Sequence, residues 1–132
     1  MKQSFQLLAG LMLTLLITGG LHAADQSVDR FLDVQQIVIL KKGADKQNQI
    51  VVSEPNRIKQ LVAALHLVKS DERICDMQWG MTFIKKAGKV EAAVCKHCFE
   101  IRDGIKIDRF ETPPEFYKLV QQIETESGQT GH

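Results

Sequence analysis

The apolar residues of this chain repeat with two different periods, and the order of those periods is the strongest constraint on its fold. In two segments they recur at i, i+3, i+4 and i+7, the spacing that places side chains on one face of an α-helix. Elsewhere they alternate or form short β-branched runs, which are typical of strands. The two helical stripes are Ile58, Leu61, Val62 and Leu65, and Phe116, Leu119, Val120 and Ile123.

The strand-like segments lie before and between these two stripes. Trp79, Met81 and Phe83 alternate with smaller residues, so we expect their side chains on one side of a sheet. Asp103-Gly104 indicates a hairpin turn, after which Ile105 and Ile107 are expected to share a face. The expected strand segments are residues 35–42, 47–52, 78–85, 90–94, 99–102 and 105–110.

We predict from this pattern an α+β fold in the order ββαβββα. The sheet is expected to be mainly antiparallel, with both helices packed on one of its faces. Residues 35–126 form the single domain, residues 24–34 a lead-in segment, and residues 127–132 a flexible tail.

Two local signals mark the expected helix starts. In Ser53-Glu54-Pro55 a small polar residue precedes a proline, which suits a helix cap and first turn. In Thr112-Pro113-Pro114-Glu115 we expect Thr112 to cap the helix and Pro113 to take its first position. Glu115 would then complete a capping box.

The first 23 residues have the three parts of an export signal. Lys2 gives a positive start, residues 7–17 form an apolar core, and small residues precede the expected cleavage after Ala23. The apolar core is short for a membrane span of about 20 residues, which argues against a retained anchor. We therefore expect a cleaved product of 109 residues that is periplasmic or secreted and has no stable membrane anchor.

The charge balance excludes one class of partner. The whole chain has 17 Lys and Arg against 16 Asp and Glu, and removal of the signal takes away only Lys2. A product without net charge argues against nucleic-acid binding, which needs an excess of cations. With 44% apolar and 25% charged residues, the composition is typical of a folded globular domain.

Three cysteines are the most informative reactive residues. Cys95 and Cys98 form a C-x-x-C pair, and Cys75 precedes a predicted strand. Disulfides persist in exported proteins, so we interpret the cysteines first as candidates for a structural bridge. Closing a loop of roughly 20 residues from Cys75 would stabilise the fold by about 3 kcal/mol, and a local Cys95–Cys98 bridge is also open.

Metal binding and thiol redox chemistry are the alternative interpretations of the same residues. Cys75, Cys95, His97 and Cys98 would make a Cys₃His set that suits zinc, and nearby methionines would suit Cu(I). A zinc ribbon has two C-x-x-C knuckles, whereas this chain has one. A redox C-x-x-C usually begins a helix, whereas this one lies between strand-like segments.

No other group of side chains forms a catalytic motif. His66 is expected near a helix end and Trp79 in the core, while the carboxylates do not organise into an acid–base pair. We assign no catalytic residue and expect the protein not to be an enzyme, with no cofactor unless the zinc or copper interpretation holds.

The pattern resembles small, uncharacterised, exported bacterial α+β proteins. The similarity covers roughly residues 35–123: an opening hairpin, a helix like 58–65, a cysteine-bearing loop, a strand like 81–84 and a closing helix. The resemblance implies a fold and an export route, but no activity and no site residue.

These observations predict an exported, non-enzymatic domain that binds a protein or associates with the cell envelope. Its partner would be an envelope or secreted protein, and the open face of the sheet would be the binding surface. The alternative is a periplasmic zinc, copper or thiol-redox protein that uses Cys75 and the Cys95-Lys96-His97-Cys98 motif. An odd number of cysteines also allows a covalent dimer.

Overall fold

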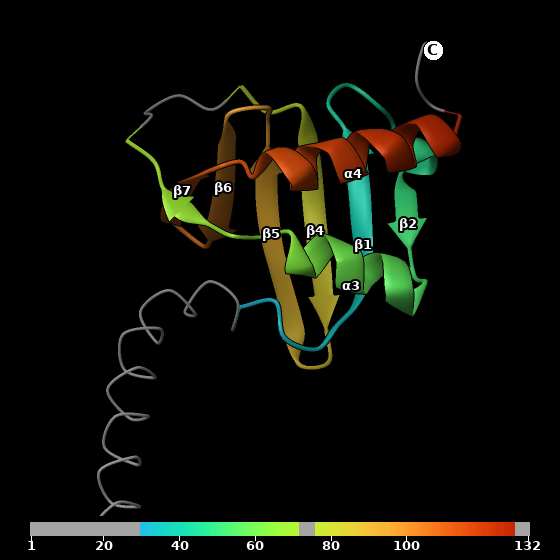
Figure 1. The fold of residues 1–132 in the computed structure, drawn as a ribbon, viewed down its shortest axis with the longest axis horizontal. Helices are drawn as coiled ribbons and strands as arrows, with labels where there is room; N and C mark the ends of the chain where they lie inside the picture. Colours follow the sequence, from blue (N-terminus) through green and yellow to red (C-terminus); the bar gives the residue numbers. More distant parts are fainter. Residues whose placement is uncertain (1–29, 72–75, 129–132) are drawn as a thin grey trace, which may run out of the picture.

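The computed structural model describes residues 30–71 and 76–128, which fold around one seven-stranded sheet (Figure 1). Its strand order is β2-β1-β4-β5-β6-β7-β3, and every pair of neighbours is antiparallel. The strands are β1 (Val34–Lys41), β2 (Ile50–Val52), β3 (Val68–Lys69), β4 (Trp79–Lys85), β5 (Gly88–Val94), β6 (Cys98–Asp103) and β7 (Lys106–Glu111).

Two α-helices and one 3₁₀ turn complete the described elements. Helix α3 (Pro55–Ala63) follows β2, helix α4 (Pro114–Glu126) follows β7, and the 3₁₀ turn η1 (Lys46–Asn48) precedes β2. The predictions of an α+β fold and of an antiparallel sheet are therefore confirmed.

Side chains on one side of the sheet, which we call the core face, belong to a single buried cluster. Trp79, Met81 and Phe83 on β4 are at most 2% exposed, which confirms the alternation predicted for this segment. Their neighbours in the register include Ile37 and Val94, which are also buried. The other side, the second face, carries the alternate residues of the same strands.

Phe31 extends this core beyond the predicted domain start. Its ring lies 4.8 Å from that of Phe83 in an edge-to-face arrangement, a favourable geometry for aromatic pairs. At 2% exposed it is as well buried as residues within the strands. Because residue 31 was assigned to the lead-in segment, the sequence pattern missed a core position.

The helices bury most of the stripes that their spacing predicts, while Val62 and Leu119 are partly buried. Ile58 and Leu61 of α3 are buried, as are Phe116 and Val120 of α4. Leu65 is buried too, but it lies after the end of α3 at Ala63.

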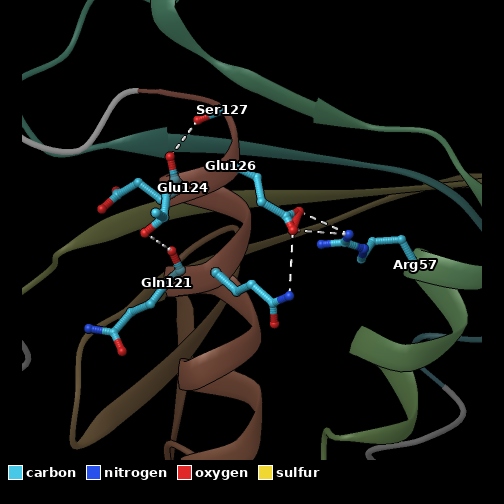
Figure 2. A network of polar contacts seen from close by, with 7 residues as sticks. Arg57, Gln121, Glu124, Glu126 and Ser127 are labelled. Carbon is cyan, nitrogen blue, oxygen red and sulfur yellow. Dashed lines mark hydrogen bonds and ion pairs between the residues drawn. The ribbon is translucent and has the colours of Figure 1, made fainter.

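An ion pair joins the exposed sides of the two helices (Figure 2). The Arg57 guanidinium lies 3.0 Å from Oε1 and 3.4 Å from Oε2 of Glu126, so one cation on α3 reaches both carboxylate oxygens on α4.

Both helices begin one residue later than their sequence signals indicate. Glu54, not Ser53, caps α3, and Pro113, not Thr112, caps α4. Neither cap makes a side-chain hydrogen bond, so the predicted capping box does not form. The helices start instead where proline fixes the backbone and needs no hydrogen-bond acceptor for its nitrogen.

The predicted order ββαβββα is wrong in its number of strands. Five strands, β3 to β7, lie between the helices, where that order has three, although four of them had been expected as the segments 78–85, 90–94, 99–102 and 105–110. The strand that no expected segment covers is β3. β3 has only two residues, both exposed, so no alternation marks it in the sequence. Its pairing with the end of β7 is a tertiary contact that local pattern does not encode.

The loops also shorten two predicted strands. β2 starts at Ile50, because residues 46–48 form the 3₁₀ turn in place of the strand expected from residue 47. β7 starts at Lys106, and Ile105 lies in the turn with its side chain 103% exposed. Gly104, with φ of +62°, takes the first position of this two-residue loop, which glycine suits.

Several predictions fall on residues 1–29, 72–75 and 129–132. The export signal at residues 1–23, most of the lead-in segment, Cys75 and the end of the predicted tail lie outside the described residues. Within the described residues, neither helix is long and apolar enough to cross a membrane.

Candidate functional site

The C-x-x-C pair forms the tight turn between β5 and β6. The backbone N–H of Cys95 donates to the Cys98 carbonyl at 2.9 Å, closing the hairpin. The N–H of Cys98 donates to the Cys95 Sγ at 3.2 Å.

Thr112 holds this turn in place from the start of α4. Its hydroxyl donates to the Cys95 carbonyl at 2.7 Å, and its backbone N–H donates to the His97 carbonyl at 3.3 Å. The residue is 6% exposed, so these bonds are shielded from water. Thr112 therefore satisfies the turn rather than the helix end, which is why its predicted capping role is wrong.

A cleft of about 1010 Å³ lies beside the turn. Lys96 and His97 of the turn line it on one side, and Tyr117 and Lys118 of α4 line it on the other. The Tyr117 hydroxyl donates to Gln78 at 2.8 Å, which fixes the ring. The carboxylates of Asp71 and Glu111 also line the cleft, but apolar surface makes up the larger part of its lining.

Three of the four cysteine and histidine candidates, Cys95, His97 and Cys98, lie in or beside the turn between β5 and β6. Cys98 is fully buried, Cys95 is half-buried and His97 is exposed in the cleft. Among the described residues, no three His, Cys, Asp or Glu side chains gather as a metal site would require. Cys75 lies outside those residues, so its disulfide and metal roles remain predictions.

A second candidate lies on the second face of the sheet, where Glu100 of β6 joins two arginines. The Arg102 Nε donates to one Glu100 oxygen at 2.9 Å, and the Arg109 Nε donates to the other at 3.0 Å. Glu100 is 4% exposed, whereas the side chains of Arg102 and Arg109 are 51% and 34% exposed. The two guanidinium groups thus shield the carboxylate while they remain open to solvent.

The register of the β6–β7 hairpin produces this arrangement. Glu100 faces Arg109 directly across the hairpin, and Arg102 lies two residues along β6 on the same face. The Arg109 carbonyl accepts from Ser70 N–H at 3.1 Å, so the peptide groups of Arg109 point away from β6. Such a pair has no mutual backbone bonds, and its side chains come closer together than in a bonded pair.

The electrostatics of Glu100 follow from its burial and its two partners. Burial alone would raise the pKa of this carboxyl, but hydrogen bonds from Arg102 and Arg109 and their positive charges outweigh it. The pKa of Glu100 therefore lies below its ordinary value. The group is a carboxylate at neutral pH, and the three side chains together carry one positive charge.

Asp108 forms a smaller ion pair on the core side of β7. A hydrogen bond from Arg30 at 3.0 Å is the largest cause that lowers the pKa of this carboxyl, and the charge of Lys69 adds to it. Arg30 is the first residue that the structure describes. The pair joins the segment before β1 to the far end of the sheet.

Glu124 is a second buried carboxylate, placed on the core face. The indole N–H of Trp79 donates to its Oε2 at 2.7 Å, and Lys41 Nζ lies 3.9 Å from its Oε1. Glu124 is 6% exposed, and Trp79 is fully buried. One neutral donor from the core therefore satisfies a helix carboxylate whose position suggested only a surface residue.

The sequence analysis missed both organised carboxylates. For Glu100 a signal was present, since alternation puts Glu100 and Arg102 on one face of a predicted strand. The meeting with Arg109 depended on the position of the turn: a two-residue loop at Asp103-Gly104 would pair Glu100 with Ile107, whereas the observed loop at residues 104–105 pairs it with Arg109. For Glu124 there was no signal, because its partner Trp79 lies 45 residues away in sequence.

Comparisons with protein-family models, with curated proteins and with solved structures found no match for this chain. Its function is therefore inferred from its own residues and their contacts.

Proposed function

We propose that this protein is an exported, non-enzymatic module that binds an envelope or secreted protein through the second face of its sheet. The observation that carries the proposal is the pair of arginines held by the nearly buried Glu100 on that face. Arginine is enriched at protein interfaces because its guanidinium forms several directed hydrogen bonds.

The arrangement of the helices is part of the same proposal. We propose that α3 and α4 cover the core face together and leave the second face open. The view in Figure 1, in which both helices are drawn in front of the sheet, supports this arrangement. The buried cluster also supports it, because it contains side chains of both helices and of the core face.

Exposed apolar residues on the second face support a protein as the partner. Val51, Val68 and Ile107 are 47%, 59% and 45% exposed, and the strand register places each of them on this face. Ile107 faces Arg102 and Val68 lies on β3 next to β7, whereas Val51 lies on β2 at the opposite edge of the sheet. Apolar side chains beside ordered arginines, as Ile107 is, are the composition of interface centres. Burying them against a partner would add hydrophobic stabilisation to the polar contacts.

Site-directed photo-crosslinking in the cells that make the protein tests this proposal. A photoreactive residue at Glu91 or Ile107 samples the second face, and the same residue at Lys59 or Gln122 samples the exposed helix surfaces. We expect a discrete adduct from positions 91 and 107 and none from positions 59 and 122. Equal adducts from all four positions, or none from the sheet, would contradict the proposal.

A structural disulfide is the proposed role of the cysteines in this module. The tight turn that Thr112 fixes supports it, because a rigid turn offers one cysteine in a defined position for a partner. The alternative function is a periplasmic zinc, copper or thiol-redox protein built on Cys75, Cys95, His97 and Cys98. The turn in which the Cys98 N–H donates to the Cys95 Sγ supports this alternative, because a C-x-x-C turn presents two sulfurs as metal ligands or as a redox pair.

Intact mass measurement separates the two roles of the cysteines. The intact mass of protein purified from its export compartment is measured under native conditions, and again after denaturation and thiol alkylation. One alkylated thiol, a mass two hydrogens light and no bound ion support the disulfide. Three alkylated thiols and a native mass heavier by one zinc or copper would support the metal alternative.

A further inference from the structure

The guanidinium groups of Arg102 and Arg109 have most of their hydrogen-bonding capacity left after they bind Glu100. An arginine has five N–H donors, and one Nε donor from each residue is used by the carboxylate. Within residues 30–71 and 76–128, Glu100 is the one partner that the structure gives to either side chain. The Nη donors of both residues are therefore available on a solvent-exposed face.

We propose that Arg102 and Arg109 bind a carboxylate of the partner protein, with Glu100 as the residue that positions them. This inference rests on the proposed function and names the chemistry by which the second face recognises its partner. The carboxylate belongs to an Asp or Glu side chain, or to the C-terminus, of the protein that docks there.

Preorganisation is the first argument for this site. A free arginine side chain loses rotamer freedom when it binds, and that loss weakens the complex. Here the bonds of 2.9 and 3.0 Å to Glu100 already restrict both side chains. An incoming carboxylate would therefore meet donors that are held in one place, at a smaller entropic cost.

Charge is the second argument, and it selects a carboxylate over a phosphate. The Glu100 group of three side chains carries one positive charge, which matches one monoanion. On the same face Lys89 lies 3.2 Å from Glu91 and neutralises it, whereas the exposed Glu111 of β7 adds a negative charge. A dianionic phosphate would meet both Glu100 and Glu111, so repulsion opposes it more strongly.

The surroundings of the arginines are the third argument. Ile107 lies directly opposite Arg102 in the hairpin and is 45% exposed, so an apolar contact adjoins the donors. Arg102 also borders a hollow of about 190 Å³ whose lining has four cations, Arg102 among them, and the two carboxylates of Asp103 and Asp108, so cations are in excess there. Both features favour an acidic residue flanked by apolar residues on the partner.

A peptide titration with nuclear magnetic resonance detection tests the site on the whole mature chain. The probe is the blocked tripeptide Ac-Leu-Glu-Leu-NH₂, and its neutral control is Ac-Leu-Gln-Leu-NH₂. We expect saturable shifts of the Arg102 and Arg109 Nε–H signals with the glutamate peptide. The glutamine peptide should bind about tenfold more weakly, because hydrogen bonds to charged groups are the stronger ones.

Three variants separate a positioned site from a general positive charge. Arg102→Lys with Arg109→Lys keeps both charges but removes the planar forks, so affinity for the glutamate peptide should fall about tenfold. Arg57→Lys, on the helix side, is the matched control and should leave affinity unchanged. Glu100→Gln keeps both arginines but loosens them, and it should weaken binding even if the double variant fails to fold.

Several outcomes would overturn the inference. These are equal affinity for the two peptides, unsaturable shifts, unchanged affinity of both Glu100→Gln and the lysine double variant, or tighter binding of inorganic phosphate at equal ionic strength. The crosslinking experiment distinguishes this failure from failure of the proposed function. Adducts from positions 91 and 107 that persist in the lysine double variant would keep the protein-binding face but remove the carboxylate contact.

Discussion

Glu124 and Glu100 are both almost excluded from water, but the protein satisfies them in opposite ways. On the core face, Glu124 accepts one hydrogen bond from the neutral indole of Trp79 at 2.7 Å. On the second face, Glu100 accepts one from each of two arginines, whose side chains remain partly exposed. The first carboxylate is enclosed by the core, whereas the second is covered by the charged side chains that it binds.

Because their partners differ, the two carboxylates have different effects on the protein. The hydrogen bond of Glu124 ends inside the protein at Trp79, and its one contact with a partly exposed cation, Lys41, is long at 3.9 Å. The main effect of these contacts is to fix the end of α4 against β4. The contacts of Glu100 end at solvent, because the arginines present further donors to whatever approaches. A buried charge on an open face costs desolvation that apolar residues would avoid, so its retention there favours a role in binding over one in stability.

Loss of Trp79 should have the largest effect on stability. Trp79→Ala removes a fully buried ring and the donor to Glu124, so we expect the free energy of unfolding to fall by about 3–5 kcal/mol. Urea unfolding followed by far-ultraviolet circular dichroism measures it, since Trp79 is the only tryptophan. Trp79→Phe keeps an aromatic ring without the donor, and a loss as large as that of alanine would show that packing contributes little.

Removal of the Glu100 charge should have an intermediate effect. Glu100→Gln leaves two guanidinium groups close together without their counter-charge, and we expect a loss of about 1–3 kcal/mol. The matched control on the same face is Glu91→Gln, whose exposed pair with Lys89 should contribute less than about 1 kcal/mol. Equal losses in the two variants would mean that burial does not distinguish Glu100.

The low pKa of Glu100 predicts acid sensitivity. The folded-state pKa lies below the ordinary value of 4.5, so on acidification the unfolded chain takes up its proton first. This stabilisation is fully present above pH 4.5 and is lost as the pH falls toward the folded-state pKa. Asp108 adds a similar loss below its ordinary value of 3.8.

Unfolding free energy measured between neutral pH and pH 3 checks this prediction. The wild-type protein should lose stability more steeply than Glu100→Gln, which lacks the titrating group. If the unfolding free energy of the two proteins fell with the same slope against pH, the electrostatic interpretation of Glu100 would be wrong.

The smallest effect is expected at the Arg57–Glu126 pair, which joins the helices at the surface. Arg57→Gln should lower the free energy of unfolding by about 0.2–1 kcal/mol, because exposed ion pairs are weak. Thermal unfolding at low and high salt measures it, and high salt should shrink the difference between variant and wild type. If Arg57→Gln lowered the free energy of unfolding as much as Glu100→Gln does, the exposed Arg57–Glu126 pair would contribute as much as the buried Glu100 group.

Much of the fold could be predicted from local pattern. The spacing in residues 58–65 and 116–123 identified both helices, and the alternation from Trp79 to Phe83 identified a core-facing strand. Phe31 and the strand β3 were missed, because one aromatic residue and two exposed residues have no period. The helix caps were misplaced, because Thr112 bonds to the Cys95 turn instead of the helix end.

Little of the candidate site could be predicted. The cysteines were the candidate site residues predicted from the sequence. Their turn lies between β5 and β6, beside the cleft of about 1010 Å³. The sequence pattern did not identify Glu100, whose significance depends on Arg109 nine residues later. Displacement of the turn by one residue was enough to hide that contact, since it changes the residue opposite Glu100 from Ile107 to Arg109.

Sequence by itself determined both helices, most of the strands and most of the side chains that enter the core, because periodicity and hydrophobicity act locally along the chain. Tertiary structure alone decided which polar groups meet. Glu124 met Trp79 and Thr112 met the Cys95 turn across long separations in sequence, and Glu100 met Arg109 through a turn whose register local signals left open. The physical reason is that charge and hydrogen bonding depend on distances between atoms, and those distances exist only after the sheet has paired and the helices have packed.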